Sequence, residues 1–309
     1  MNAETMNTAR MPIISILGMG YVGCTLATCL GNDGHKVLGC ELDVVRRNRL
    51  KSGLLPFDNL QLQVLFEQVE YMGRFRVVDD PREAVLHSDI TFICVGTPTT
   101  ADGDFDHKYV LDAAETIGEA LAHKSGDHTV VVKSTVRPGI TKQVYELITK
   151  QSGRLFSEVS VVFNPEFLRE ASLVDDYYHP PFIVIGDDAH NGAAHYVQNL
   201  FRKCFAPTIL TSVRGAEMIK LACNTYHALK VTFANEIASI SAHEGVDPLK
   251  VMAVLASDHK LNNSALYLKP GGPFWGHCLP KDVRALTVLA REAGVSIPMI
   301  EAILVSNGS

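Results

Sequence analysis

A glycine-rich stretch near the start of the 309-residue sequence has the spacing of a dinucleotide-binding loop. Gly18, Gly20 and Gly23 follow the apolar run 13–17 and open a segment rich in Ala and Leu. In such a strand–turn–helix unit, the first glycine permits the tight turn, the second lets backbone approach a pyrophosphate, and the third lets helix pack on strand. Glu41 ends the next apolar run about 20 residues on, where a carboxylate can accept bonds from a ribose 2′-hydroxyl.

Arg46, a few residues after that acid, is the feature that favours NADP, because a guanidinium can bind a 2′-phosphate. A solvated cation on a helix is the alternative interpretation of the same residue. The carboxylate of Glu41 repels a 2′-phosphate, so NAD is the expected cofactor.

Cys278 differs from the other cysteines in its surroundings. It lies in the Gly- and Pro-rich run 271–282, which leads into a helix; Pro280 suits the first turn of that helix, and Lys281 is close by. A thiol beside a helix N-terminus and a cation should have a lowered pKa and be a good nucleophile. The alternative is an inert loop cysteine. The adjacent His277 could carry a proton, although a lone histidine is more often structural.

Lys220 and Asn224 are one turn apart on a long predicted helix and therefore share a face. Because their neighbours are apolar, Lys220 either lays its stem on apolar surface while its ammonium reaches water or is placed in a site, and the pattern alone favours the first. Small polar residues also close three predicted strands, in the runs 96–98, 134–135 and 164–166. Ligands bind at this end of the strands in open α/β sheets, but ordinary turn chemistry uses the same residues.

The elements that must position these residues alternate along the chain. Short apolar runs predict strands at 13–17, 36–40, 89–95, 129–133, 159–163 and 182–185. Helices are expected after the glycine loop and at 109–123, 141–150, 215–245, 249–257 and 283–294. The fold class is therefore α/β, a Rossmann-like, doubly wound parallel sheet followed by an all-helical domain with one long helix. We expect a flexible tail over 1–10, a dinucleotide-binding domain over 11–206 and a helical domain over 207–309.

Composition excludes several classes of protein. The net charge of −6 argues against a nucleic-acid binder, which needs a basic face for phosphates. No apolar run approaches the ~20 residues of a membrane helix, and the first ten residues lack the apolar stretch of a signal peptide. The seven cysteines form no C-x-x-C pair, so reduced thiols and no metal site are expected. The sequence thus predicts a cytoplasmic protein that does not bind a membrane.

Six ordered motifs, from about Met11 to Asn307, resemble those of the UDP-glucose/GDP-mannose dehydrogenase family. They are GMGYVG (18–23), CVGTP (94–98), KSTVRPG (133–139), NPEFLRE (164–170), EMIKLACNTYHALKVTFANE (217–236) and CLPKD (278–282). The run 258–262, followed by Tyr267 and by 269–271, looks like the GDP-mannose branch.

The resemblance implies an NAD-dependent, four-electron oxidation of a sugar C6 alcohol to a carboxylate, with GDP-mannose as substrate and with polysaccharides such as alginate downstream. Cys278 would capture the aldehyde as a thiohemiacetal, which becomes a thioester that water cleaves. Lys220 and Asn224 would stabilise the oxyanion, and Asp282 would assist through Lys220 or an ordered water. Glu166, with Glu170 nearby, would orient or activate the water, and Thr135 would help to hold it. The helical domain would form a homodimer.

The binding residues are likewise implied by the resemblance. Contacts to NAD are expected from Gly18, Gly20, Tyr21, Val22, Gly23, Glu41, Arg46, Thr97, Thr135 and Lys281. Contacts to the nucleotide sugar are expected from Glu166, Phe167, Leu168, Glu170, Lys220, Asn224, Tyr267 and Cys278.

Two departures from the family pattern keep alternatives open. Trp275 and His277 stand where the family loop has glycine and serine, and the chain ends before the family's second α/β domain. UDP-glucose is therefore an alternative substrate, and a shortened, non-catalytic NAD-binding paralogue is an alternative function. A two-electron β-hydroxyacid dehydrogenase also has a Lys-x-x-x-Asn pair, but it has no need of the thiol of Cys278.

Overall fold

The computed structural model describes residues 10–154, 158–243, 245–258, 271–294 and 297–308. They divide into two compact units. The first unit holds the described residues of Met1–Thr97 together with those of His107–Glu217. The second holds Pro98–Asp106 together with the described residues of Met218–Ser309.

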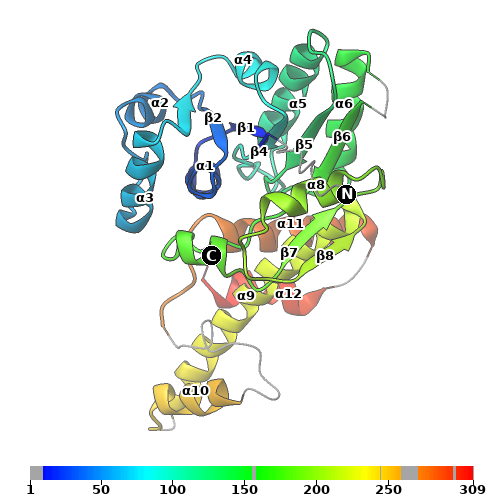
Figure 1. The fold of residues 1–309 in the computed structure, drawn as a ribbon. Coiled ribbons are helices and arrows are strands. Elements are labelled where there is room, and N and C mark those ends of the chain that lie inside the picture. The colour runs from blue at the N-terminus through cyan, green and yellow to red at the C-terminus, as the bar shows by residue number, and fades with distance from the viewer. Residues whose placement is uncertain (1–9, 155–157, 244, 259–270, 295–296, 309) are drawn as a thin grey trace, which may run out of the picture. The chain divides into compact units, whose positions relative to one another are not determined.

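An eight-stranded sheet forms the centre of the described part of the first unit (Figure 1), in the order β3-β2-β1-β4-β5-β6-β7-β8. Neighbouring strands are parallel except β6 and β7, which are antiparallel. The strands are β1 (Ile13–Leu17), β2 (Lys36–Cys40), β3 (Phe75–Val77), β4 (Ile90–Ile93), β5 (His128–Val132), β6 (Val159–Phe163), β7 (Ile183–Gly186) and β8 (Thr208–Thr211). The central strands β4 and β5 are buried along their whole length, as expected when helices cover both faces of a parallel sheet.

Helices alternate with these strands along the chain, and after β8 the described elements are all helices. Those that accompany the sheet are α1 (Tyr21–Asp33), α2 (Val44–Lys51), α3 (Leu60–Tyr71), α4 (Pro81–Leu86), α5 (Lys108–Leu121), α6 (Ile140–Ser152), α7 (Leu173–Tyr178) and α8 (Ala193–Leu200). The later ones are α9 (Val213–His243), α10 (Pro248–Ser257), α11 (Cys278–Ala293) and α12 (Pro298–Ser306).

The predicted α/β fold with a Rossmann-like sheet is confirmed, and the structure adds two features at the β7–β8 end of the sheet. Strand β8 pairs with β7, so the sheet continues past residue 206, where the sequence analysis ended the first domain. The partly exposed burial pattern of β8 explains why it lacks a strong apolar signal. The strand β7 runs against β6, which the apolar pattern of either strand cannot reveal. The predicted division into domains stays a prediction.

The long predicted helix is present as α9, whose 31 residues span roughly 46 Å. Near its C-terminal end, α10 lies beside it (Figure 1). Met252 of α10 and Ala234 of α9 belong to one buried apolar cluster. Helix α11 begins at Cys278, five residues before the predicted start at 283. Pro280 is tolerated there because the N–H groups of a first helical turn have no partner within the helix.

A chain of polar side chains, buried except at the partly exposed Lys124, crosses the sheet through three strands. The Lys124 ammonium lies 2.9 Å from Nδ1 of His128, and Nε2 of His128 lies 2.8 Å from Oγ1 of Thr91, which is 2.6 Å from Oγ of Ser15. Because an ammonium only donates, Nδ1 accepts and Nε2 carries the hydrogen. Burial, and then the charges of Lys124 and Arg154, hold the pKa of His128 well below its ordinary value. The imidazole is therefore neutral in the folded protein.

The substitution His128→Asn should weaken the acid sensitivity of the fold. The unfolded chain protonates His128 below about pH 6.5 and the folded chain does not, so wild-type stability falls as the pH falls through that range. The variant should show a slope of unfolding free energy against pH that is flatter by up to about 1.4 kcal/mol per pH unit. Urea titrations from about pH 7 to pH 5 measure this slope, with the exposed His87→Asn as the control. Equal slopes in wild type and His128→Asn would contradict the prediction.

Candidate active site

Two of the three glycines in the loop between β1 and α1 are required by the fold itself, and the third is not. Gly18 has a φ of +93°, and a Cβ there would lie 2.8 Å from the carbonyl carbon of Cys94. A Cβ on Gly23 would lie 2.0 Å from the carbonyl oxygen of Gly18, so the helix can pack on this turn only through a glycine. A Cβ on Gly20 would meet nothing within 4 Å. The protein itself does not need glycine at position 20, and a ligand that approaches the backbone there does.

The N-terminus of α1 completes an anion site beside that loop. Gly20 is the N-cap residue, and no side chain caps the helix. The N–H groups of the first turn and the helix dipole favour a negative group, and a pyrophosphate fits both. Tyr21, the first residue of α1, packs its ring against Phe57 with the ring centroids 4.1 Å apart. The residues present thus fit the pyrophosphate of NAD.

Glu41 is buried at the end of β2 and holds the loop in place. Its Oε2 accepts the N–H of Met19 at 3.0 Å, and its Oε1 accepts the N–H of Asp43 at 2.9 Å. Each carboxylate oxygen has a second lone pair, so the group can also accept bonds from ribose hydroxyls. The second role was predicted from the position of Glu41 at the end of the strand, whereas its hold on the loop has no local sequence signal. Arg46 is exposed on α2, and its own N–H is capped by the Asp43 side chain.

The ends of β4 and β5 are joined by hydroxyl groups. Thr97 donates its hydroxyl to the carbonyl of Thr135 at 2.9 Å, and Ser134 donates to the carbonyl of Val95 at 2.7 Å. These bonds bring the two predicted polar strand ends together next to the glycine loop that follows β1, the neighbour of β4. Thr135 itself is partly exposed, so its hydroxyl is available at this edge.

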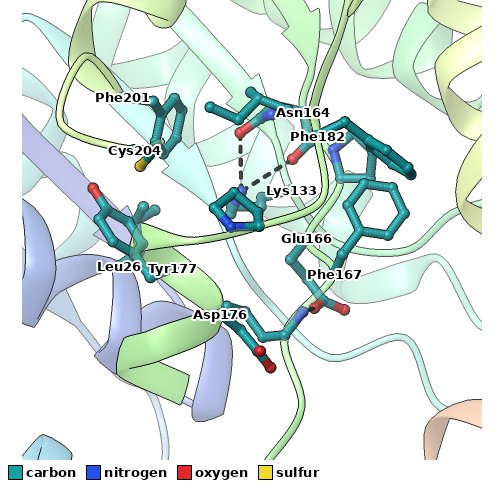
Figure 2. Close-up of a pocket in the computed structure, with 14 residues that line it drawn as sticks. Leu26, Lys133, Asn164, Glu166, Phe167, Asp176, Tyr177, Phe182, Phe201 and Cys204 are labelled. Atoms are coloured by element: carbon teal, nitrogen blue, oxygen red, sulfur yellow. Dashed lines mark hydrogen bonds between the residues drawn. The ribbon is translucent and has the colours of Figure 1, made fainter. Parts of the chain in front are cut away.

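A small cavity of about 50 Å³ lies at the end of β6 (Figure 2). Lys133 points its ammonium at Asn164, 2.9 Å from Oδ1 and 3.4 Å from the backbone oxygen. The ammonium also lies 5.4 Å from the ring centroid of Phe201. Such a volume accommodates only a few water molecules, so the cavity is too small for a sugar. Lys133 belongs to the motif KSTVRPG, and neither its type nor its spacing predicted this contact.

The predicted substrate segment 166–170 is held by Glu166 from within and by Asp176 and Phe182 from later in the chain. Oε2 of Glu166 accepts the N–H of Leu168 at 2.6 Å, and the Phe167 ring packs edge-to-face on Phe182 (Figure 2). Asp176 accepts the backbone N–H of Arg169 at 2.8 Å and also pairs with its guanidinium. Glu170 is exposed at the end of the segment. The segment is therefore a rigid turn that presents a carboxylate at the same edge of the sheet as Thr135.

The second unit contains a buried polar chain between α9 and α11. Lys220 donates its ammonium to Oδ1 of Asn224 at 3.3 Å, and Asn224 donates its amide to Oδ2 of Asp282. Lys281 lies 3.7 Å from the other oxygen of Asp282. Lys220 is 3% exposed and Asp282 is fully buried, so the pattern-based expectation that Lys220 reaches water was wrong. Neighbouring residues cannot reveal this pairing, because Asp282 comes from a different helix.

Cys278 is the first residue of α11 and is exposed. His277 precedes it as the N-cap residue and makes no side-chain capping bond. Asp282 lies four residues later on the same helix, hence one turn below the thiol on the same face. In contrast, burial raises the pKa of Cys94 and of Cys204 to about 12. Those two thiols stay protonated at neutral pH, and Cys278 is the accessible one.

The predicted site residues thus form two groups. One gathers at the glycine loop and the ends of β2, β4, β5 and β6 in the first unit, and the other gathers on α9 and α11 in the second. Tyr267 lies outside the described residues. Within the part of the chain that the structure describes, no set of three or more His, Cys, Asp or Glu side chains could hold a metal ion. Among the same residues, none of the helices has the length and apolarity that a membrane crossing requires.

Two family models match the chain. The NAD-binding domain of the UDP-glucose/GDP-mannose dehydrogenase family matches residues 12–205, and the central domain of that family matches residues 214–309.

Individual relatives agree with these matches. GDP-mannose 6-dehydrogenase from Pseudomonas aeruginosa is 44% identical over 96% of this chain and 68% of its own length. A crystal structure of a ternary complex of GDP-mannose dehydrogenase from Pseudomonas aeruginosa is 44% identical with a TM-score of 0.79, over 96% of this chain and 68% of that one. A UDP-glucose dehydrogenase from Pyrobaculum islandicum is 34% identical with a TM-score of 0.92, over 99% of this chain and 70% of that one.

Cofactor titration should show that the carboxylate of Glu41 discriminates between NADH and NADPH. Wild type should bind NADH at least about tenfold more tightly, because the buried carboxylate repels a 2′-phosphate; tenfold corresponds to about 1.4 kcal/mol. Glu41→Gln should narrow the ratio, and Asp43→Asn, which removes an exposed charge close by, should leave it unchanged. Nicotinamide fluorescence measures both dissociation constants. NADPH binding as tight as NADH binding in wild type would refute the assignment.

Proposed function

The chain belongs to the UDP-glucose/GDP-mannose dehydrogenase family of NAD-dependent oxidoreductases, and we propose that it oxidises the C6 alcohol of GDP-mannose to the carboxylate of GDP-mannuronate. The observation that carries this proposal is the buried chain Lys220–Asn224–Asp282, whose last member lies one helical turn below the exposed thiol of Cys278. A cation and an amide donor close to a nucleophile are what acyl chemistry at a former alcohol carbon needs.

Cys278 acts as the covalent nucleophile in this proposal. Two molecules of NAD⁺, bound one after the other, would supply the acceptors for two hydrides, one from the alcohol and one from the captured aldehyde. Between the two oxidations the thiolate adds to the aldehyde carbon and forms a thiohemiacetal. Loss of the second hydride leaves a thioester, and water then releases the carboxylate and regenerates the thiol. Capture keeps the aldehyde bound and divides a difficult oxidation into easier steps.

Lys220 and Asn224 stabilise the negative charge that develops on the substrate oxygen. Asn224 is held at both ends of its amide, because its oxygen accepts from Lys220 and its nitrogen donates to Asp282. This arrangement fixes the orientation of the amide and keeps the ammonium within a few ångströms of it. Preorganised donors of this kind need little rearrangement as the charge forms.

Glu166 and Thr135 orient the attacking water in the hydrolytic step of this proposal. The Glu166 carboxylate accepts the N–H of Leu168 at 2.6 Å, which fixes the orientation of the group, and a carboxylate can accept further hydrogen bonds, including those of water. Thr135 contributes a hydroxyl from the neighbouring strand end. We assign to this pair the orientation of the water that attacks the thioester.

UDP-glucose is the second candidate substrate, and the specific observation in its favour is the TM-score of 0.92 to a UDP-glucose dehydrogenase. NADH formation with GDP-mannose and UDP-glucose side by side tests the assignment. Faster turnover of GDP-mannose supports the proposal, and faster turnover of UDP-glucose replaces the substrate. Binding of NAD without turnover of either sugar would favour the non-catalytic paralogue.

A homodimer built through α9 is part of the same proposal. Met218, Tyr226 and Phe233 are partly exposed on this helix, and their spacing of eight and seven residues keeps them on one side of it. A second copy of the helix could cover this apolar face. We also propose a cytoplasmic location, where the uronate product would supply an acidic polysaccharide such as alginate.

The substitution Cys278→Ser should abolish uronate formation in protein that is active. A serine alcohol lacks the thiolate population that makes capture fast near neutral pH, and it would give an ester in place of a reactive thioester. The first hydride transfer needs no thiol, so a single-turnover signal of NADH should remain. Rapid-quench counting of NADH per site, with product analysis, measures this, and Cys223→Ser is the control. Two NADH per sugar at a normal rate from Cys278→Ser would refute covalent catalysis.

Lys220→Ala should slow oxidation and hydrolysis together, because one ammonium serves the oxyanions of both steps. Loss of one such electrostatic group typically costs about 100- to 1,000-fold in kcat. Burst and steady-state rates of NADH formation separate the two steps. A variant that slows only one of them would assign Lys220 a narrower role.

The thiol of Cys278 should also be the first to react with limiting iodoacetamide. It is exposed, whereas burial raises the pKa of Cys204 and of Cys223. Peptide mapping after partial alkylation identifies the labelled residue. Preferential labelling of Cys204 or Cys223 would contradict the prediction.

A further inference from the structure

The backbone that leads to Cys278 is held by an asparagine from the far end of the second unit. Asn307 follows the last residue of α12, and its Oδ1 accepts the N–H of Phe274 at 2.7 Å. Its Nδ2 donates to the carbonyl of the same residue at 3.1 Å. One amide side chain therefore satisfies both backbone groups of Phe274, as a neighbouring strand would.

Three attachments hold Phe274 at once. Besides its two backbone bonds, its side chain is 6% exposed and packs with Ala228, Val283 and Ile303. Asn307 is itself 7% exposed, so water does not compete strongly for these bonds. Phe274 is thus a fixed point in a loop that is otherwise open to solvent.

The loop becomes exposed to solvent immediately after Phe274. Trp275 is 83% exposed, and Gly276 has a φ of +95° that favours glycine. Cys278 then starts α11. Asn235 bonds to Gly271 and Gly272 earlier in the loop, but those bonds are exposed. Phe274 is therefore the last tightly held residue before the thiol, only four positions away from it.

We propose that Asn307 is a positioning residue for Cys278. By holding the peptide of Phe274, Asn307 fixes the point from which residues 275–277 lead to α11. It thereby fixes where α11 starts and where the thiol of Cys278 lies. The proposal rests on the role given to Cys278 in the proposed function, but the placement of the thiol can be measured without turnover. Without the Asn307 amide, the buried N–H and carbonyl of Phe274 lose their partners, and the loop must move to reach water.

The test compares Asn307→Ala and Asn307→Asp with two controls. Ser306→Ala alters the exposed neighbour of Asn307. Ile303→Val removes one methylene from the cluster that buries Phe274, and so weakens packing without touching the backbone bonds. The aspartate has the volume of asparagine and keeps the acceptor for the Phe274 N–H while losing the donor, so it stays informative if the alanine variant fails to fold.

The first measurement is the rate of alkylation of Cys278 by iodoacetamide at neutral pH. We expect Asn307→Ala to slow it about fivefold, because a frayed first turn of α11 no longer presents its N–H groups to the thiolate. Asn307→Asp should fall between Asn307→Ala and wild type, and both controls should match wild type.

The second measurement uses Trp275, the one tryptophan of the sequence. Its fluorescence anisotropy should fall in both Asn307 variants, because the loop gains motion, and should be unchanged in Ile303→Val. Wild-type alkylation and anisotropy in both Asn307 variants would overturn the proposal. So would Ile303→Val changing the two readouts as much as Asn307→Ala, because the effect would then be general destabilisation.

Failure of the proposed function gives a different result. Full two-NADH turnover by Cys278→Ser would remove the catalytic role of the thiol and leave the alkylation and anisotropy results for Asn307 unaltered. In active protein, Asn307→Ala should also release aldehyde, which raises the ratio of NADH to uronate above two.

Discussion

The parallel hydrogen bonding of β1 with β2 and β4, continued through β5 and β6, is the constraint on which the first unit depends. Parallel strands bring their carboxyl ends to one edge of the sheet, and the helix that follows each strand begins there. The glycine loop, Glu41, Thr97, Thr135 and Glu166 all lie at that edge for this reason. The strand β7 is antiparallel to β6, so its carboxyl end points the other way. The row of functional loops along this edge therefore stops at β6.

In the second unit, the main constraint is that a buried charge must have polar partners. Asp282 is fully buried, and a carboxylate removed from water needs hydrogen-bond partners. It receives the amide of Asn224 and lies near the ammonium of Lys281, while Lys220 donates to the other end of that amide. Removing any one member would leave a buried charge or dipole unbalanced, so the group is expected to respond to mutation as a unit.

Asparagine amides are the recurring connectors of functional segments in this chain. Asn164 accepts from Lys133 at 2.9 Å and donates to the carbonyl of Val184 at 2.7 Å, which ties β6 to β7 beside Glu166. Asn224 and Asn307 use their amides in the same two-ended way, at the buried polar chain and at the loop before Cys278. An amide can donate and accept without adding charge, so it can be buried where a carboxylate or an ammonium would need a counter-ion.

Local sequence determined the features that depend on neighbours along the chain. The strand–turn–helix at Gly18, Gly20 and Gly23, the long helix α9 and a helix starting near Cys278 follow from apolar periodicity and from the backbone demands of glycine and proline. The tertiary structure alone decided which distant groups meet. Lys220 was expected to reach water because its neighbours on α9 are apolar, yet α9 and α11 pack so that Asn224 and Asp282, 58 residues apart, share a bond. The bonds from Met19 to Glu41 and from Phe274 to Asn307 span 22 and 33 residues in the same way. The physical reason is that propensity and periodicity act over a few residues, whereas the burial of a polar group forces it to find a partner wherever the packing of elements brings one.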